Sequence, residues 1–346
     1  MSESLKAHPL LRQWLGLGAT GQVQAFSGKV DLGQGISHAL RLIVAQELRL
    51  SPSLIDMVPA STHTSPDEAV TSGSLSVQHS GAALRCAAAH WREMCRAAMA
   101  QRCGVDLAAV LCVNGKFSVQ ATAQTASYAE LTSAEIWQST IDTTHVQSPN
   151  AAQDTNVSLT KPTAHRPDVA SKVFGEFEYI HDRVLPNMCH GMVFRPGTLT
   201  AEVIASDMQA LVHHVQAQSG VLHVHQDGLL LGVLTDTEYA LSKIVKHIED
   251  GVTQGKFWRC HAEVPDANDL SNWLKAQPLD TTVVADITSE APTNVVQYLK
   301  AEFHRPYVQH ASIGLCCALA QWTDDAQQLE VWSHSQGIYN LRRDIA

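Results

Sequence analysis

The chain has 346 residues, of which 45% are hydrophobic and 17% charged, so it is a folded globular protein with room for two or three domains. Its formal net charge is −10 and it has no basic run, which makes nucleic acid and anionic membrane surfaces poor partners. No apolar run approaches the roughly 20 residues that span a bilayer. The first residues also lack the apolar core of a signal peptide, so we expect a cytoplasmic protein.

The first third of the chain predicts short strands joined by turns and helices. Strands are expected between residues 10 and 18 and at 23–26, followed by a helix at 36–50 with apolar residues three and four apart. A strand at 54–60 and a long alanine-rich helix at 77–102, which ends at Gly104, come next.

Two glycine-rich turns each precede a predicted helix. The first reads G-K-V-D-L-G-Q-G (Gly28–Gly35) and the second T-S-G-S-L-S-V-Q-H-S-G (Thr71–Gly81). The first N–H groups of a helix are unpaired and carry partial positive charge, so such turns can bind an anion. Gln34 adds an amide to the first turn. A single turn of this kind is more often only a turn, but the pair suits a planar, polar ligand that carries phosphate.

The remainder of the chain alternates a linker, strands and helices. The dipeptide Asn114-Gly115 predicts a hairpin, and Tyr128 begins a short helix. Residues 138–169 are rich in Ser, Thr, Asn, Gln and Pro, which is typical of a linker. The expected elements after it are strands at 172–182 and 189–195, a helix at 203–212, a hairpin at 221–234 that turns at Asp227-Gly228, helices at 236–248 (capped by Asp236 or Thr237) and 266–276, and strands at 281–287 and 329–337.

Residues that bind metals are not arranged in a recognised pattern. None of the eight cysteines lies in a C-x-x-C pair and no H-E-x-x-H occurs, which argues against zinc ribbons and iron–sulfur ligation. His223 and His225 point to one side of a strand but lack a third ligand, so a metal-dependent hydrolase is a weak alternative. Asp67 and Glu68 are expected in a solvated turn.

Several motifs in the chain resemble the molybdopterin-binding subunits of the xanthine dehydrogenase and aldehyde oxidase family. The most similar branch contains the large subunits of nicotinate dehydrogenase and isoquinoline 1-oxidoreductase. Besides the two turns, the matching segments are Lys172–Asp182, Leu185–Pro196, Asp227–Val233 and the stretch H-A-S-I-G to S-Q-G, which ends at Gly337. The resemblance implies that the pterin cofactor is held by Gly33, Gln34, Gly35, Gly73, Ser74, Leu75 and Ser76. It also implies that Gln336 hydrogen-bonds an oxo ligand of molybdenum.

The resemblance implies an α+β fold divided in a particular way. A molybdopterin-binding α/β segment covers residues 1–137 and a linker covers 138–169. An α/β domain of the aldehyde oxidase "hammerhead" type covers 170–262. Residues 263–346 begin a second molybdenum-binding domain, which is incomplete in this chain. In the family roughly as much sequence again follows, and it carries the glutamate that acts as general base.

The implied function is part of a molybdenum hydroxylase that hydroxylates an N-heterocycle or oxidises an aldehyde, with water as the oxygen source. The implied cofactor is molybdenum-molybdopterin in its cytosine dinucleotide form, shared with a second molybdopterin-binding half or subunit. A [2Fe–2S] subunit and a c-type cytochrome would carry electrons away from the small-molecule substrate. We expect no activity without the partner chain, and a periplasmic location remains open through such a partner. The alternative is a truncated or non-catalytic cofactor-binding or scaffold subunit.

Overall fold

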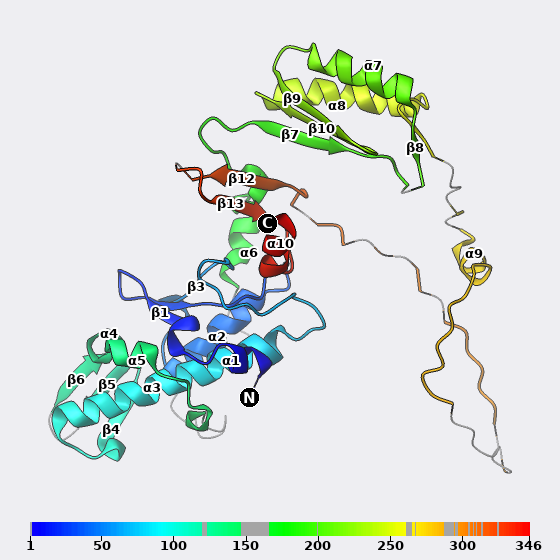
Figure 1. Cartoon of the computed structure of the whole chain (residues 1–346). Helices are drawn as coiled ribbons and strands as arrows, with labels where there is room; N and C mark the ends of the chain where they lie inside the picture. Colours follow the sequence, from blue (N-terminus) through cyan, green and yellow to red (C-terminus); the bar gives the residue numbers. More distant parts are fainter. Residues whose placement is uncertain are drawn as a thin grey trace. The chain divides into compact units, whose positions relative to one another are not determined.

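The computed structural model describes residues 2–119, 123–146, 166–198, 200–260 and most of 265–346, where residues 267, 287–293, 295–296, 304, 307, 309, 313 and 324 fall outside the description. The chain divides into two compact units, one formed by residues 1–182 together with 312–346 and the other by 183–311. Helices and strands are mixed in both units, so the α+β class is confirmed (Figure 1). Residues 170–182 and 312–346 thus join the first unit, whereas the predicted domain boundaries stay a prediction.

The first unit contains most of the helices and strands. Its helices are α1 (Glu3–Ala7), α2 (Ile36–Leu48), α3 (Ala82–Cys103), α4 (Tyr128–Leu131), α5 (Ala134–Gln138), α6 (Pro167–Val173) and α10 (Ile338–Ile345). Its strands are β1 (Leu15–Leu17), β2 (Val23–Ala25), β3 (Ile55–Met57), β4 (Val110–Val113), β5 (Lys116–Val119), β6 (Gln124–Ser127), β12 (Ala318–Trp322) and β13 (Leu329–Ser333). They form the sheets β1-β2-β3, β4-β5-β6 and β12-β13, in which only the β2–β3 pair is parallel.

Helix α3 forms the centre of the hydrophobic core of the first unit. It buries small residues along one side, which lets α2 and the strands approach closely, and it buries the indole of Trp91 between Tyr128 and Trp137. A π-helical turn (Val77–Gly81) leads into α3, and Gly104 ends it in the left-handed conformation at φ 64°. The predicted helix and its stop are therefore confirmed.

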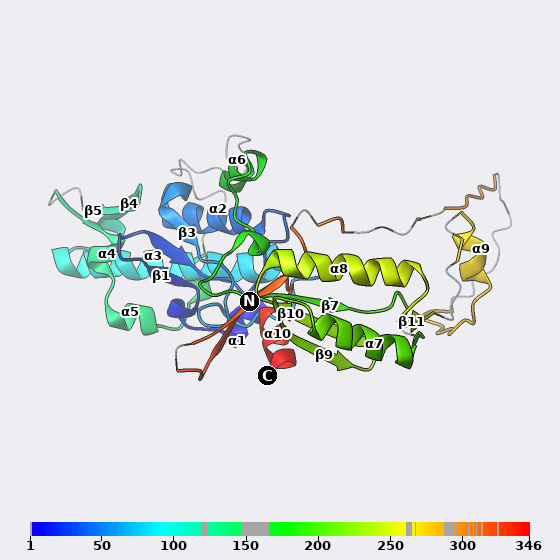
Figure 2. The ribbon, with the colours of Figure 1, turned by 90° about the horizontal axis from the view of Figure 1, so that it is seen from above.

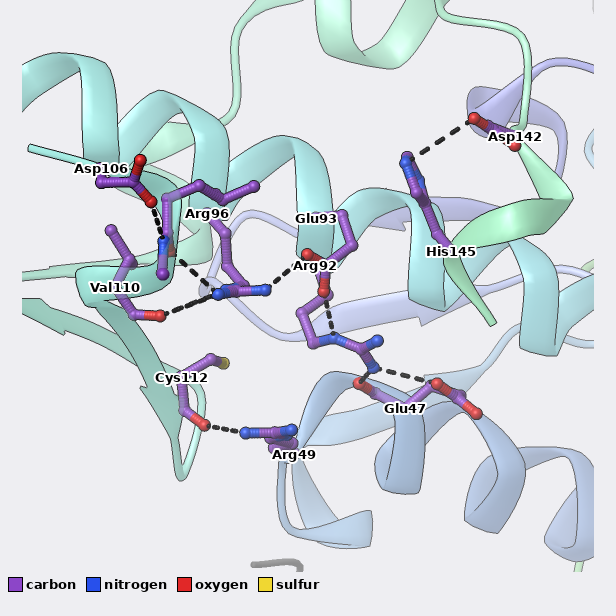
Figure 3. A network of polar contacts seen from close by, with 12 residues as sticks. Glu47, Arg49, Arg92, Glu93, Arg96, Asp106, Val110, Cys112, Asp142 and His145 are labelled. Atoms are coloured by element: carbon purple, nitrogen blue, oxygen red, sulfur yellow. Dashed lines mark hydrogen bonds and ion pairs between the residues drawn. The ribbon is translucent and has the colours of Figure 1, made fainter. Parts of the chain in front are cut away.

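A chain of buried ion pairs ties α2, α3 and β4 together (Figure 3). The guanidinium of Arg92 donates to the carboxylate of Glu47 at 2.9 Å and to that of Glu93 at 3.0 Å, and its side chain is only 4% exposed. Burial opposes the charge of Arg92, but its bonds to Glu47 and Glu93 outweigh this and raise its pKa. Arg49 reaches across to the carbonyl of Cys112 at 2.9 Å. The network therefore fixes the end of α2 against α3 and the β4 hairpin.

The segment that precedes the predicted linker is clipped onto α3 by a buried histidine. The Nε2 of His90 lies 2.8 Å from the hydroxyl of Ser139, and its Nδ1 accepts the N–H of Asp142 at 3.2 Å. The ring of His145 stacks on His90 at 5.4 Å. Burial and the neighbouring His145 lower the pKa of His90, so the neutral ring is the form that holds the clip.

The second unit is a three-stranded antiparallel sheet with two helices on one face (Figures 1 and 2). Its elements are β7 (His190–Phe194), β8 (Glu202–Val203), α7 (Ala205–Gln216), β9 (Val221–Asp227), β10 (Leu230–Thr235), α8 (Glu238–Thr253), β11 (Trp258–Arg259) and α9 (Leu270–Lys275). The sheet order is β7-β10-β9, and α7 and α8 bury Met208, Leu211 and Ile244 against it. The hydroxyl of Thr237 accepts the N–H of Ala240, so Thr237 rather than Asp236 caps α8.

Two predicted strands are wrong. Residues 172–182 hold the end of α6, an irregular stretch and one 3₁₀ turn, because Pro167 begins a helix that ion pairs from Asp168 to Arg166 and Lys172 stabilise. Residues 281–286 lie in no strand, and Val283 and Val284 are exposed, so no packing favours one there. Within the predicted linker, residues 147–165 lie outside the described residues, whereas α6 occupies part of its end. Among the described residues, no helix is long and apolar enough to cross a membrane.

Candidate cofactor site

The turn that contains Gly33, Gln34 and Gly35 is held by its own aspartate. The carboxylate of Asp31 accepts the backbone N–H groups of Gly33 at 2.9 Å, Gly35 at 3.3 Å and Ser37 at 3.1 Å. Burial raises the pKa of Asp31, but these three donors outweigh it and the net pKa is lowered. The N-terminus of α2 therefore already has its anion, which corrects the expectation of free N–H groups there.

The side chain of Gln34 is also engaged within the turn. Its amide oxygen accepts the N–H of Leu32, and its amide nitrogen donates to the carbonyl of Val30 at 3.1 Å. Gly33 and Gly35 have φ values of 98° and 79°, which explains why the tight turn needs glycine at both positions. Gly33 and Gln34 are exposed, so the turn presents backbone rather than a free amide to a ligand.

The second turn, by contrast, presents donors that its own structure does not use. Gly73 and Ser74 follow each other in the left-handed conformation at φ 66° and 57°, and Ser74 is exposed. The N–H groups of Ser76 and Val77, at the start of the helical run into α3, have no acceptor among the described residues. Of the two predicted anion-binding turns, this one has donors available for a ligand.

A buried segment, residues 66–71, joins the two turns. The ammonium of Lys29 donates to the carbonyls of Glu68 at 2.6 Å and Val70 at 3.1 Å, and the N–H of Val30 donates to the hydroxyl of Thr71 at 2.9 Å. Gly28 lies so close to this segment that a Cβ there would meet the carbonyl oxygen of Pro66 at 2.2 Å. The first turn and the 66–71 segment are therefore packed backbone against backbone.

Glu68 is buried in this junction, so the expectation of a solvated turn is wrong for it. The residue is only 6% exposed, and one carboxylate oxygen accepts from the N–H of Gly28 and the hydroxyl of Ser27. The other oxygen has no partner among the described residues. Asp67 is half-buried and accepts an ion pair from Arg343 at 3.5 Å.

The S-Q-G segment near the C-terminus docks on the same stretch of chain. The N–H of Thr71 donates to the carbonyl of Gln336 at 2.7 Å, and the amide nitrogen of Gln336 donates to the carbonyl of Thr71 at 3.1 Å. The hydroxyl of Tyr339 in α10 donates to the carbonyl of Ser65 at 2.6 Å. An amide nitrogen carries two hydrogens, so one N–H of Gln336 remains for a ligand.

Arg166 lies on the first turn and was not singled out from the sequence. Its guanidinium donates to the carbonyl of Gly33 at 3.2 Å and lies 2.8 Å from where a Cβ of Gly35 would be. The carboxylate of Asp168 binds Arg166 and Lys172, and these bonds together lower the pKa of Asp168 despite its desolvation. The signal R-P-D, with proline at the first helical position, marks a helix start and could have located α6.

The residues present fit a phosphate-bearing pterin in part. The structure brings the first turn, the turn at Gly73–Ser76 and Gln336 onto one segment, and it leaves donors at Ser76, Val77 and Gln336 for oxygen-rich groups. It does not offer the amide of Gln34, which is bonded within its own turn. Among the described residues no group of three or more His, Cys, Asp or Glu side chains could hold a metal ion, and the rings of His223 and His225 merely stack 6.3 Å apart.

Comparison with known proteins agrees with this arrangement. Residues 8–176 match the family model of the molybdopterin cofactor-binding domain. A nicotinate dehydrogenase subunit of Pseudomonas putida is 31% identical over 336 residues, which are 94% of this chain and 27% of that protein. The gamma subunit of the 6-hydroxypseudooxynicotine dehydrogenase complex of Paenarthrobacter nicotinovorans is 33% identical over 114 residues, which are 33% of this chain and 14% of that one.

A solved structure, reconstituted CO dehydrogenase from Oligotropha carboxidovorans, is 26% identical with a TM-score of 0.31 over 34% of this chain and 15% of that one. The chain spans only about a quarter of the length of the nicotinate dehydrogenase subunit that it matches, so that relative is longer than the family resemblance alone implies. On the family model and the match over nearly its whole length, the chain belongs to the molybdopterin-binding subunits of the xanthine dehydrogenase family.

Proposed function

We propose that this chain supplies part of the cofactor cradle of a molybdenum hydroxylase that acts on an N-heterocycle or an aldehyde, with water as the oxygen source. One observation carries the proposal. The G-Q-G turn and Gln336 are some 300 residues apart in the sequence, yet both bond to Thr71 at the start of the serine-rich turn. An N-heterocyclic substrate is supported by the name of the nicotinate dehydrogenase relative.

The residues of the cradle have distinct tasks in this proposal. Gly73, Ser74, Leu75 and Ser76 bind an anionic or carbonyl group of the cofactor through backbone N–H and hydroxyl donors. Gly33 and Gly35, with Gln34 between them, allow close backbone approach, and Gln336 offers its remaining amide N–H to an oxygen ligand. When bound, the cofactor supplies the redox chemistry that inserts oxygen from water into an electron-poor C–H bond.

The proposal needs further chains. A second molybdopterin-binding half or subunit would complete the cradle and supply the general base, and we propose that this chain is inactive without it. A [2Fe–2S] subunit and a c-type cytochrome would take the electrons. The cofactor form would be the cytosine dinucleotide, and a partner with a signal would take an otherwise cytoplasmic chain to the periplasmic side. The subunit names of both relatives support a multi-chain assembly.

The test is the molybdenum content of the chain purified alone and of the chain co-purified with the products of its neighbouring genes. Molybdenum near one atom per chain in the co-purified sample, and far less in the chain alone, is the expected result. Stoichiometric molybdenum in the isolated chain would contradict the shared cradle. Activity should then be screened with nicotinate-like heterocycles and with aldehydes.

A non-catalytic scaffold subunit is the second candidate, and one observation favours it. The amide of Gln34 and the N-terminus of α2 are satisfied within the chain, so that half of the cradle is complete without a ligand. Molybdenum in neither sample, while the chain still co-purifies with a partner, would favour this role.

A further inference from the structure

Thr71 is the residue at which the first turn and the C-terminal segment meet. Its hydroxyl accepts the N–H of Val30 at 2.9 Å. Its backbone N–H donates to the carbonyl of Gln336 at 2.7 Å, and its carbonyl accepts the amide of Gln336 at 3.1 Å. Every polar group of Thr71 is thus bonded to one of two segments that are remote from each other in the chain.

Burial makes these bonds difficult to replace by water. Thr71 is 5% exposed, and the preceding residues are held by Lys29, which is 7% exposed and bonds the carbonyls of Glu68 and Val70. If the hydroxyl were removed, the N–H of Val30 would be left without its acceptor in a buried place. The first turn would then lose its only side-chain bond to Thr71 among the described residues.

We propose that Thr71 is a positioning residue that sets the place of Gln336 relative to the G-Q-G turn. This inference rests on the proposed function, because it assigns to Thr71 the alignment of two parts of one cofactor cradle. Thr71 touches neither cofactor nor substrate in the proposal. It acts through Val30 on one side and through the backbone and amide of Gln336 on the other.

The coupling is tested by hydrogen exchange on the full chain without cofactor. Thr71→Val keeps the shape and removes the acceptor, whereas Thr71→Ser keeps the acceptor. We expect Thr71→Val to speed exchange in peptides covering 334–341 by about fivefold to tenfold, the factor expected for one lost buried hydrogen bond. Thr71→Ser should remain within about twofold of the wild type, which is rescue by the conservative variant.

Thr132 provides a matched control in the same unit. Its hydroxyl also accepts one N–H from a buried residue, the indole of Trp91 at 2.9 Å, but it has no bond to either turn. Thr132→Val should therefore destabilise the chain without a selective change at 334–341. Unchanged exchange at 334–341 in Thr71→Val, or an equal change in Thr132→Val, would overturn the proposal.

The reverse perturbation keeps the test informative if Thr71→Val fails to fold. Gln336 is exposed, so Gln336→Ala should fold, and it should speed exchange at residues 28–31 through Thr71. No change there would overturn the proposal as well. In a co-purified complex, Thr71→Val should lower kcat while molybdenum content and KM stay near the wild type. If no complex contains molybdenum, the proposed function fails, but the exchange experiment still decides the role of Thr71.

Discussion

Replacing Gly28 by alanine should separate the first turn from the 66–71 segment. The new Cβ would lie 2.2 Å from the carbonyl oxygen of Pro66 and 3.1 Å from the N–H nitrogen of Glu68, and both are backbone atoms that cannot rotate away. Ordinary contact needs about 3.4 Å, so the segments must move apart by roughly 1 Å. This movement would break the bond from the N–H of Gly28 to the carboxylate of Glu68, which is 2.9 Å long.

The expected cost combines overpacking, about 1–3 kcal/mol, with the loss of a buried bond to a charged group, about 1.5–3 kcal/mol. We therefore expect Gly28→Ala to lower the free energy of unfolding of the first unit by about 2–5 kcal/mol. Hydrogen exchange in increasing urea would report this unit separately from the other. Gly18→Ala is the control, because its nearest neighbour would be 3.7 Å away. Wild-type stability in Gly28→Ala would refute the close backbone contact.

Three further predictions concern the buried charges and the first turn. Arg92→Met should destabilise the chain by about 3 kcal/mol or more, because it leaves the carboxylate of Glu47 buried with one partner fewer; adding Glu47→Gln should recover part of the loss in urea denaturation, and a neutral single variant would contradict the network. The lowered pKa of His90 means that the unfolded chain binds more protons, so stability should fall as pH drops below about 6.5 and this slope should flatten in His90→Gln; identical slopes at pH 5.5–7.5 would count against it. Arg166→Ala removes the donor to the carbonyl of Gly33, so hydrogen exchange at 31–36 should rise a few-fold, with Arg166→Lys in between, and unchanged exchange would contradict the contact.

Local signals in the sequence were sufficient for many of the elements. The Asn114-Gly115 hairpin was predicted from residues that tolerate positive φ, and both adopt it, at 49° and 71°. The stop of α3 at Gly104 and the cap at Thr237 have similarly local causes. The predicted strand at 172–182 was wrong because its alternating pattern competes with the helix that starts at Pro167, and the helix is the more stable of the two.

The candidate site was predictable only in part, because its geometry depends on contacts between distant segments. Motif resemblance named the two turns and Gln336, but nothing local indicated that all would bond to Thr71. The position of Asp31 before a glycine turn and a helix was a readable capping signal. The burial of Glu68 had no such signal, since it follows from the close approach of Gly28 across 40 positions of the chain.

The most direct test of a shared cradle is hydrogen exchange on the co-purified complex, prepared from cells grown with molybdate and from cells starved of it. The account predicts that loading with molybdenum slows exchange together at three places: residues 28–36, 71–77 and 334–338. Matched wild-type samples with equal subunit composition and measured molybdenum content make the comparison clean. Protection at only one of these segments, or at none of them in a sample that contains molybdenum, would contradict the claim that they form one cofactor site.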